Sequence, residues 1–188
     1  MKSGVRALGI AESYGDDADR STLAGAVVRA DGVLDGLAYG SCTVGGTDAT
    51  DAVGSLADEL ARPDVRYVLV GTVAPAWYNL LALSSVHAAV DRPVLAVTFE
   101  TSSGLEPALR EAFSGDALER RLEIYHALPP RHELSVNDET VYVRHLGCDA
   151  AEAADVVRTF TPAGGRPEPV RVARVAARAG DSYVRALE

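Results

Sequence analysis

The sequence predicts an α/β fold in which three antiparallel strands precede a parallel β-α-β unit, in a mixed sheet flanked by helices. Three observations lead to this prediction. Apolar runs of strand length, 23–30 and 33–44, are joined by Asp31-Gly32, a two-residue link typical of a β-hairpin. The runs 66–71 and 93–99 are continuously apolar, as in parallel strands covered on both faces. Segments of helical periodicity lie between and after these runs.

The length and composition are those of an ordinary globular protein. The 188 residues fit one domain, 1–188, with a sizeable core, and 47% hydrophobic and 24% charged residues are unremarkable. No apolar run approaches the roughly 18 residues needed to cross a bilayer. The first residues lack the apolar core of a signal peptide. We therefore expect a cytoplasmic protein without a membrane partner, and free thiols at Cys42 and Cys148.

The charge composition is unusual. The net charge is −9, and Lys2 is the only lysine, so arginine supplies every other basic side chain. This favours a salt-loving host with a GC-rich genome, although GC bias alone also replaces lysine by arginine. An acidic protein is normally repelled by nucleic acid. At about 1 M salt, however, the Debye length is only about 3 Å, so the acidity does not exclude a nucleic-acid substrate.

The chain is organised around its first strand, in the segment 5–14. This segment begins apolar and ends at the carboxylate of Glu12, which an acidic loop with Asp16, Asp17 and Asp19 follows. A buried strand that ends in an acid is the usual way in which an α/β fold presents charge at its ligand-binding edge. The alternative is that Glu12 is only the first polar residue after a core strand.

The remaining elements follow in the order of an RNase H-like sheet. Asp48, with Asp51 three residues on, is expected to cap the first helix. The strand 140–144 is expected at a sheet edge, and Asp149 is expected to cap the next helix. In this topology the first strand lies beside the fourth, so Glu12 lies near Gly71. The other predicted segments are a helix at 49–61, a loop at 72–79 with a helix to about 90, helices at 105–113, 117–128 and 149–160, a linker at 162–169 and a helix at 170–187.

Four segments resemble the archaeal endonuclease dU family: 6–13, 46–51, 74–79 and 166–174. The likeness covers nearly the whole chain in order. That family is distantly similar to endonuclease V, an RNase H-like, Mg²⁺-dependent enzyme that acts on deaminated nucleic acid. The resemblance implies a DNA-repair endonuclease that cuts at deaminated bases such as deoxyuridine. It also implies Mg²⁺ or Mn²⁺ as cofactor and nucleic acid as partner, with DNA favoured.

The resemblance also assigns acidic residues. Endonuclease V carries acids at the end of its first strand, before its first helix and at the end of its fourth strand. Glu12 and Asp48 match the first two positions and are the expected catalytic metal ligands, whereas the third position falls on Gly71. Mg²⁺ prefers oxygen ligands, and two carboxylates are few for two ions. We hypothesise that Glu100, after the fifth strand, replaces the missing acid; it is otherwise a solvated loop residue. The gap at Gly71 also favours an alternative, a catalytically impaired relative that binds nucleic acid or protein.

Two further groups are candidates for contact with nucleic acid. An extruded base is held by stacking and by hydrogen bonds to its edge, which aromatic and amide side chains near the site supply; core positions are the alternative for the aromatic residues. One face of the last helix is rich in arginine, either as a phosphate-contacting stripe or as a solvated face. An apolar stripe of Val172, Val175, Ala179 and Tyr183 is expected beside it. No motif suggests a nucleotide cofactor. The candidates are Tyr14, Trp77, Tyr78 and Asn79 for the base, and Arg171, Arg174 and Arg178, with Arg185, for phosphates.

Overall fold

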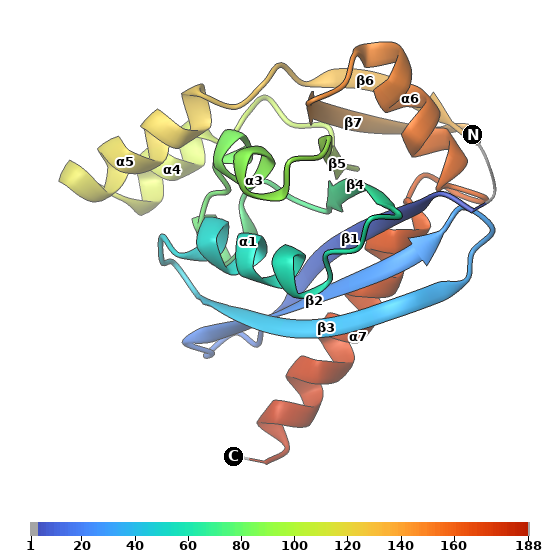
Figure 1. Ribbon diagram of the computed structural model, residues 1–188. Helices are drawn as coiled ribbons and strands as arrows, with labels where there is room; N and C mark the ends of the chain where they lie inside the picture. The colour runs from blue at the N-terminus through green and yellow to red at the C-terminus, as the bar shows by residue number, and fades with distance from the viewer. Residues whose placement is uncertain (1–3, 188) are drawn as a thin grey trace.

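A seven-stranded mixed sheet with the order β3-β2-β1-β4-β5-β7-β6 runs through the protein in the computed structural model, which describes residues 4–187 (Figure 1). The strands are β1 (Arg6–Ser13), β2 (Arg20–Arg29), β3 (Leu34–Thr43), β4 (Val65–Val70), β5 (Val94–Thr98), β6 (His132–Val136) and β7 (Glu139–Leu146). The helices are α1 (Ala49–Glu59), α2 (Pro75–Tyr78), α3 (Leu83–Val90), α4 (Glu106–Ala112), α5 (Gly115–His126), α6 (Ala150–Thr159) and α7 (Glu168–Arg185). None of the helices within residues 4–187 combines the length and apolar character that spanning a bilayer requires.

The predicted arrangement of the first five strands is confirmed. β1, β2 and β3 pair antiparallel, and β1 pairs parallel with β4, which pairs parallel with β5. The hairpin between β2 and β3 turns at Gly32, whose φ of +88° favours glycine. Because β1, β4 and β5 are parallel neighbours, their carboxyl ends, and the residues that follow them, lie along one edge of the sheet.

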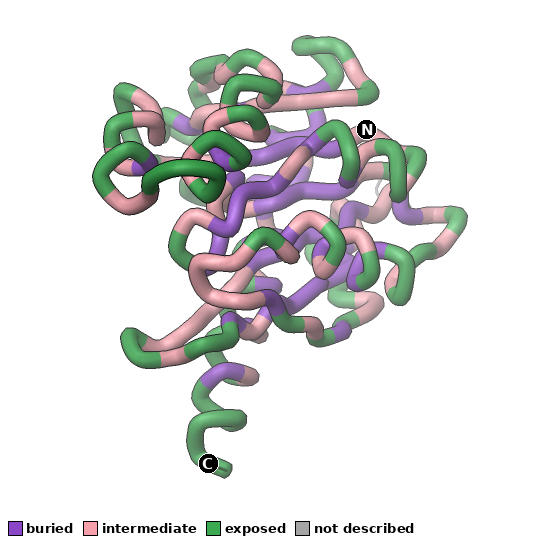
Figure 2. Tube along the Cα trace, turned by 90° about the vertical axis from the view of Figure 1, so that its left-hand side faces the viewer, coloured by how far each residue is buried: buried purple, intermediate pink, exposed green. Residues whose placement is uncertain are grey.

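Helices cover both faces of the sheet. On one face, side chains of α1 and α3 such as Leu56 and Val86 are buried against Leu8 and Val68. On the other face, α6 and the start of α7 cover Leu69 and Leu95. Figure 2 shows the resulting buried strands between more exposed outer segments.

The edge beyond β5 differs from the prediction. β7 lies inside the sheet, paired antiparallel with both β5 and β6, so the expectation that it forms an edge is wrong. The edge strand is β6, which the sequence pattern does not indicate. Within β6 only Leu134 and Val136 pack on the core, with Ser135 exposed between them. This alternation is too short to indicate a strand from the sequence.

The face of α7 that packs on the sheet also differs from the predicted apolar stripe. Val170, Ala173 and Ala177 are buried, whereas Val175 and Tyr183 are 58% and 66% exposed. The helix lies so close to β1 that a Cβ atom at Gly9 would overlap the backbone carbonyl of Pro169. Small residues therefore face the sheet. The C-terminal part of α7 extends beyond the sheet (Figure 1).

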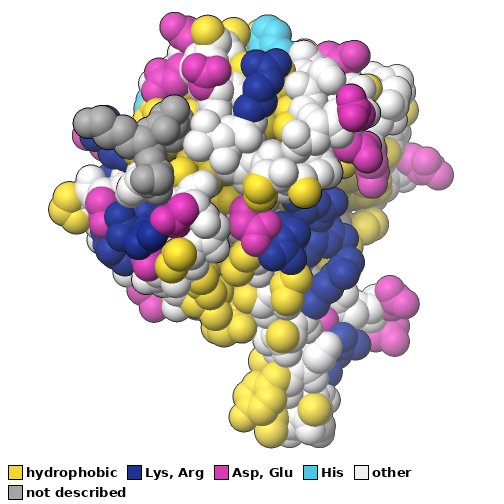
Figure 3. All heavy atoms as spheres, turned by 90° about the vertical axis from the view of Figure 1, so that its right-hand side faces the viewer, with side chains coloured by type: hydrophobic (Ala, Val, Ile, Leu, Met, Phe, Trp, Pro, Cys, Tyr) yellow, Lys and Arg dark blue, Asp and Glu magenta, His cyan; other side chains and the backbone are white. Residues whose placement is uncertain are grey.

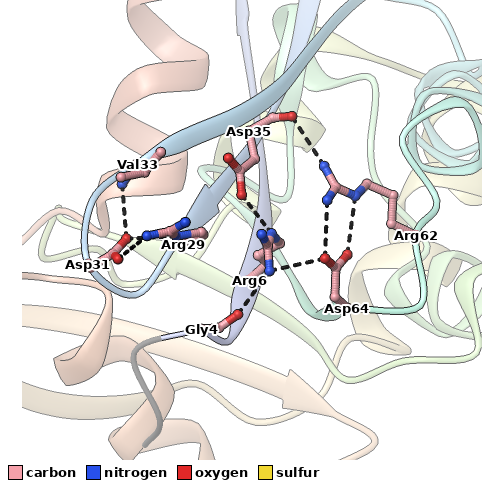
Figure 4. Close-up of polar contacts among 8 residues, drawn as sticks. All are labelled: Gly4, Arg6, Arg29, Asp31, Val33, Asp35, Arg62 and Asp64. Atoms are coloured by element: carbon pink, nitrogen blue, oxygen red, sulfur yellow. Dashed lines mark hydrogen bonds and ion pairs between the residues drawn. The ribbon is translucent and has the colours of Figure 1, made fainter.

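An ion-pair network ties the amino-terminal edge of the sheet together (Figure 4). Arg6 at the start of β1 contacts Asp35 on β3 at 2.7 Å and Asp64 before β4 at 3.0 Å, and Arg62 contacts Asp64 at 3.1 Å. The network joins segments far apart in the chain at the end of β1 opposite Glu12.

Candidate functional site

Two cavities adjoin at the carboxyl ends of β1, β4 and β5. The larger has a volume of about 570 Å³ and the smaller of about 310 Å³. Glu12, Thr72, Thr98 and Glu100 line both. The predicted proximity of the ends of these strands therefore places Glu12 and Glu100 in the walls of one shared site.

Glu12 lies near the end of β1, and a neighbouring strand holds its carboxylate. The fully buried Ser21 on β2 donates a hydrogen bond from Oγ to Oε2 of Glu12 at 2.7 Å. Tyr14, two residues on, also lines the larger cavity. Burial, together with the nearby charge of Glu12, raises the pKa of Tyr14, so its hydroxyl stays protonated at neutral pH.

Asp48 directly precedes α1, as predicted, but its side chain does not cap the helix. Its backbone is helical rather than extended, with φ −101° and ψ 0°, so the carboxylate turns back toward β3. There it accepts hydrogen bonds from Thr43 N at 3.0 Å, Thr43 Oγ1 at 2.8 Å and Asn79 Nδ2 at 2.7 Å. Burial opposes ionisation, but these hydrogen bonds together lower the pKa of Asp48. Asp48 therefore organises the turn between β3 and α1.

Glu12 and Asp48 lie on the same side of the sheet, near Cys42. Burial first, and then the charges of Asp48 and Glu12, raise the pKa of the Cys42 thiol to about 12. Cys42 pairs across the strands with Ser21, the residue that holds Glu12. The structure thus brings both acids near one buried thiol, although only Glu12 is among the residues that line the two cavities.

The fit of the site to a divalent cation follows from these positions. Within residues 4–187, no three Asp, Glu, His or Cys side chains gather closely enough to hold a metal ion. A preformed two-ion cluster therefore does not fit the described residues. Mg²⁺ keeps several waters and is often bound through one or two carboxylates plus substrate phosphate. Glu12 and Glu100, as oxygen donors in one site, fit a single ion of this kind.

A strained backbone segment forms one wall of the larger cavity. Ala76, Trp77 and Tyr78 in α2 have φ values of 47°, 53° and 61°. This left-handed conformation costs roughly 1–2 kcal/mol for each residue with a Cβ atom. Such strain persists only where the surrounding structure fixes the backbone, and it is concentrated at functional sites.

Arg121 on α5 fixes this strained segment. It is only 4% exposed, and it donates hydrogen bonds to the carbonyl oxygens of Tyr78 at 3.1 Å, Gly45 at 2.6 Å and Gly46 at 3.0 Å. Its guanidinium carbon lies 3.8 Å from the centre of the Phe113 ring. Arg121 thereby joins the β3–α1 turn to the wall of the cavity. This role is not apparent from the sequence, because nothing in the helix pattern distinguishes Arg121 from its neighbour Arg120.

The residues predicted to contact a base take different positions. Trp77 is 48% exposed and lines the larger cavity together with Tyr14 and Tyr78. Asn79 is fully buried. It accepts a hydrogen bond from Ala49 N at 2.9 Å, capping α1, and it donates to Asp48. The prediction that Asn79 touches a base is therefore not supported, and its amide instead positions the turn that carries Asp48.

The predicted arginine face divides into two groups. Arg171 and Arg185 form ion pairs on α7, with Glu168 and Asp181 respectively. Arg174 lines the smaller cavity. Burial first, and then the charges of Arg174 and Arg178, lower the pKa of Arg166. Arg166 also lines this cavity, with its guanidinium carbon 4.3 Å from the centre of the Phe99 ring. The place of Arg166 in the cavity is not apparent from the sequence, because the residue lies in the segment assigned to a linker.

Comparison with known proteins confirms the resemblance and the RNase H-like fold. The model of the Endonuclease dU family matches residues 3–180. A UPF0215 protein from Pyrobaculum calidifontis is 32% identical over 179 residues, covering 94% of this chain and 97% of that protein. A protein of unknown function from Archaeoglobus fulgidus superimposes with a TM-score of 0.81 at 23% identity, over 93% of this chain and 97% of that one.

Endonuclease V shares the fold at greater distance. The Ciona intestinalis enzyme, solved with a 24mer DNA containing an inosine followed by a ribo-adenosine, superimposes with a TM-score of 0.64 at 12% identity. The match covers 96% of this chain and 87% of that one. From the match over residues 3–180, we conclude that this chain belongs to the Endonuclease dU family.

Proposed function

We propose that this protein is a metal-dependent endonuclease that cuts nucleic acid at deaminated bases such as deoxyuridine, as a step of DNA repair. One observation carries the proposal. A cavity of about 570 Å³ combines the carboxylates of Glu12 and Glu100 with the exposed ring of Trp77. Its volume lies in the range of small-molecule sites, and its lining offers both stacking surfaces and oxygen donors. The endonuclease V fold and the family name support the same reaction class.

Hydrolysis of a phosphodiester requires a water molecule to attack phosphorus while the bond to the leaving oxygen breaks. A bound Mg²⁺ or Mn²⁺ would lower the pKa of a coordinated water and stabilise the charge on the leaving oxygen. Glu12, held by Ser21 at 2.7 Å, and Glu100 would hold this ion. Asp48 supports the site from the adjoining turn.

Recognition of the base is assigned to the aromatic wall. An enzyme that acts at a damaged base takes it out of the stack and holds it between aromatic or apolar side chains. Trp77, Tyr78 and Tyr14 line the cavity for this purpose. The hydrogen bonds of Arg121 hold the left-handed segment in place, so the Trp77 ring stays at the wall before a base arrives.

A cleavage assay tests the proposal. Labelled strands with one deoxyuridine or one deoxyinosine are incubated with Mg²⁺ or Mn²⁺ at about 0.1 M and about 1 M salt, which vary the screening. Loss of a metal ligand removes several kcal/mol of transition-state stabilisation. Glu12→Gln and Glu100→Gln should therefore each reduce the cleavage rate by a factor of about 100 or more. Glu133→Gln, at an exposed carboxylate on β6, is the matched control. Equal cutting by Glu12→Gln and the control would refute the assignment.

A second function is favoured by a specific observation. Gly71 at the end of β4 carries no carboxylate, and the described residues contain no group of three metal ligands. A catalytically impaired relative that binds nucleic acid or protein would have these features. Binding of deoxyuridine strands without cutting, under every metal and salt condition above, would establish this alternative in place of the nuclease.

A further inference from the structure

Three arginines without ionic partners gather where α7 joins the body of the protein. Arg174 and Arg178 lie on α7, and Arg166 precedes it. Within the described range 4–187 none of the three forms an ion pair or a side-chain hydrogen bond, whereas Arg171 and Arg185 on α7 are both paired. Arg174 and Arg178 are one turn apart on α7, and Arg166 lines the smaller cavity together with Arg174. Burial first, and then the charges of Arg174 and Arg178, lower the pKa of Arg166. Figure 3 shows basic side chains grouped at this place.

Mutual repulsion among cations is unfavourable unless an anion compensates for it. The chain carries a net charge of −9, so acidic side chains that could pair with these arginines are abundant. An unpaired cluster in such a protein points to an anionic ligand from outside the chain.

The cluster opens onto the smaller cavity of the site. Arg166 and Arg174 line this cavity of about 310 Å³ on one side, and Glu12, Gly71 and Glu100 line it as well. The guanidinium of Arg166 lies over the Phe99 ring, which restricts the orientation of this side chain. A planar guanidinium held in this way is suited to two parallel hydrogen bonds with a phosphate group.

Gly71 lines the same cavity as Arg166 and Arg174 and lies close to the start of α7. A Cβ atom at Gly71 would lie 3.0 Å from Cγ1 of Val170 at the start of α7. That distance is tight, so a side chain at the end of β4 would require Val170 to shift. The same helix brings Arg174 to the rim.

We propose that Arg166, Arg174 and Arg178 form a binding site for a backbone phosphodiester of the nucleic acid, beside the carboxylates of Glu12 and Glu100. This inference rests on the proposed function, because it takes nucleic acid as the ligand. The two cavities share Glu12, Thr72, Thr98 and Glu100, so a nucleotide with its base in the larger cavity places an adjoining phosphate in the smaller one. The guanidinium groups supply positive charge at the phosphate, where a two-ion enzyme would use its second cation.

Equilibrium binding without metal tests this site separately from cleavage. Fluorescence anisotropy of a labelled single strand containing one deoxyuridine is measured in EDTA as salt is varied. Each lost phosphate contact on a single strand lowers the slope of log K against log salt by about 0.7. Arg174→Ala should reduce this slope by about 0.7 and weaken binding about 10-fold at about 0.1 M salt. Arg166→Ala should behave alike, whereas Arg174→Lys, which keeps the charge, should retain the slope.

Arg66→Ala provides the matched control. Arg66 is an exposed arginine near the start of β4, at the edge of the sheet opposite Glu12, and its loss should leave the slope unchanged. A second strand carries uncharged methylphosphonates at the phosphates flanking the deoxyuridine. This strand should bind the wild-type protein about 10-fold more weakly, and it should bind Arg174→Ala as well as the unmodified strand does.

The outcomes separate the two proposals. Three results would overturn the phosphate site. The first is a wild-type salt slope for both Arg174→Ala and Arg166→Ala, the second is an equal loss of slope in Arg66→Ala, and the third is no binding by the wild-type protein. Loss of cutting in Glu12→Gln together with any of these results would leave the nuclease proposal standing. The expected binding pattern without any cutting would retain the phosphate site and refute the nuclease.

Discussion

Arg121 offers the sharpest test of how the cavity is built. Arg121→Met keeps an unbranched side chain but removes the guanidinium, which leaves the carbonyl oxygens of Tyr78, Gly45 and Gly46 without this donor. A hydrogen bond to a charged group contributes about 1.5–3 kcal/mol. The three are coupled, and the variant no longer buries a charge, so we expect a net loss of about 3–5 kcal/mol. At about 2–4 °C for each kcal/mol in a chain of this size, Tm should fall by about 6–20 °C.

Urea unfolding followed by circular dichroism measures this loss, and fluorescence locates it. Trp77 is the only tryptophan and lies in the segment that Arg121 holds, so its emission should shift to longer wavelength in Arg121→Met at low urea. Arg120→Met, at the exposed neighbouring position, should change the unfolding free energy by less than about 0.5 kcal/mol. Equal losses in the two variants, or an unchanged Trp77 emission, would refute the assignment of Arg121 to the cavity wall.

Three further predictions concern other parts of the fold. Gly9→Ala should lower the unfolding free energy by about 3 kcal/mol, because its methyl group would overlap the backbone of Pro169; an effect as small as that of Gly4→Ala, where nothing lies within 4 Å, would contradict the close packing. The pKa of Asp48 is lowered from 3.8, so its contribution to stability is present above that pH and is lost as the pH falls through the lower folded value. Urea midpoints between about pH 5 and pH 2 should therefore fall more steeply for the wild-type protein than for Asp48→Asn, and parallel curves would argue against it. Arg6→Ala should lower the unfolding free energy by about 1–2 kcal/mol at about 0.1 M salt and by less at about 1 M salt, without changing oligonucleotide binding; a salt-independent loss would exclude an electrostatic origin.

The sequence predicts the parts of the fold that depend on local patterns. The Asp31-Gly32 turn and the continuous apolar strands specify the order and direction of β1 to β5. β6 escapes prediction because its apolar alternation is confined to Leu134 and Val136. The packed face of α7 escapes prediction because it depends on a missing side chain at Gly9, on a strand about 160 residues away, and close approach of two backbones leaves no periodic signal.

The candidate site likewise has features that the sequence predicts and features that depend on tertiary packing. The position of Glu12 follows from strand length and topology alone. The orientation of the Asp48 side chain does not follow from the sequence, because Thr43 and Asn79 compete with the amino-terminal backbone of α1 for its carboxylate. The left-handed segment that contains Trp77 has no glycine that would indicate it in the sequence. Arg121 on α5 holds this segment in place. Arg166 acquires its place only through the packing of α7 on β1.

The dependence of the cavity wall on Arg121 has a consequence for biosynthesis. Arg121 is separated by 43 residues from Tyr78 and by 76 from Gly45. A chain emerging from the ribosome folds from its amino end first, so β1 to β4 reach the solvent well before the side chain that clamps the turn. Until α5 arrives, the strained segment lacks the hydrogen bonds that Arg121 donates to Tyr78, Gly45 and Gly46. The wall of the larger cavity is therefore completed late, after β1, which carries Glu12, has paired with its neighbouring strands.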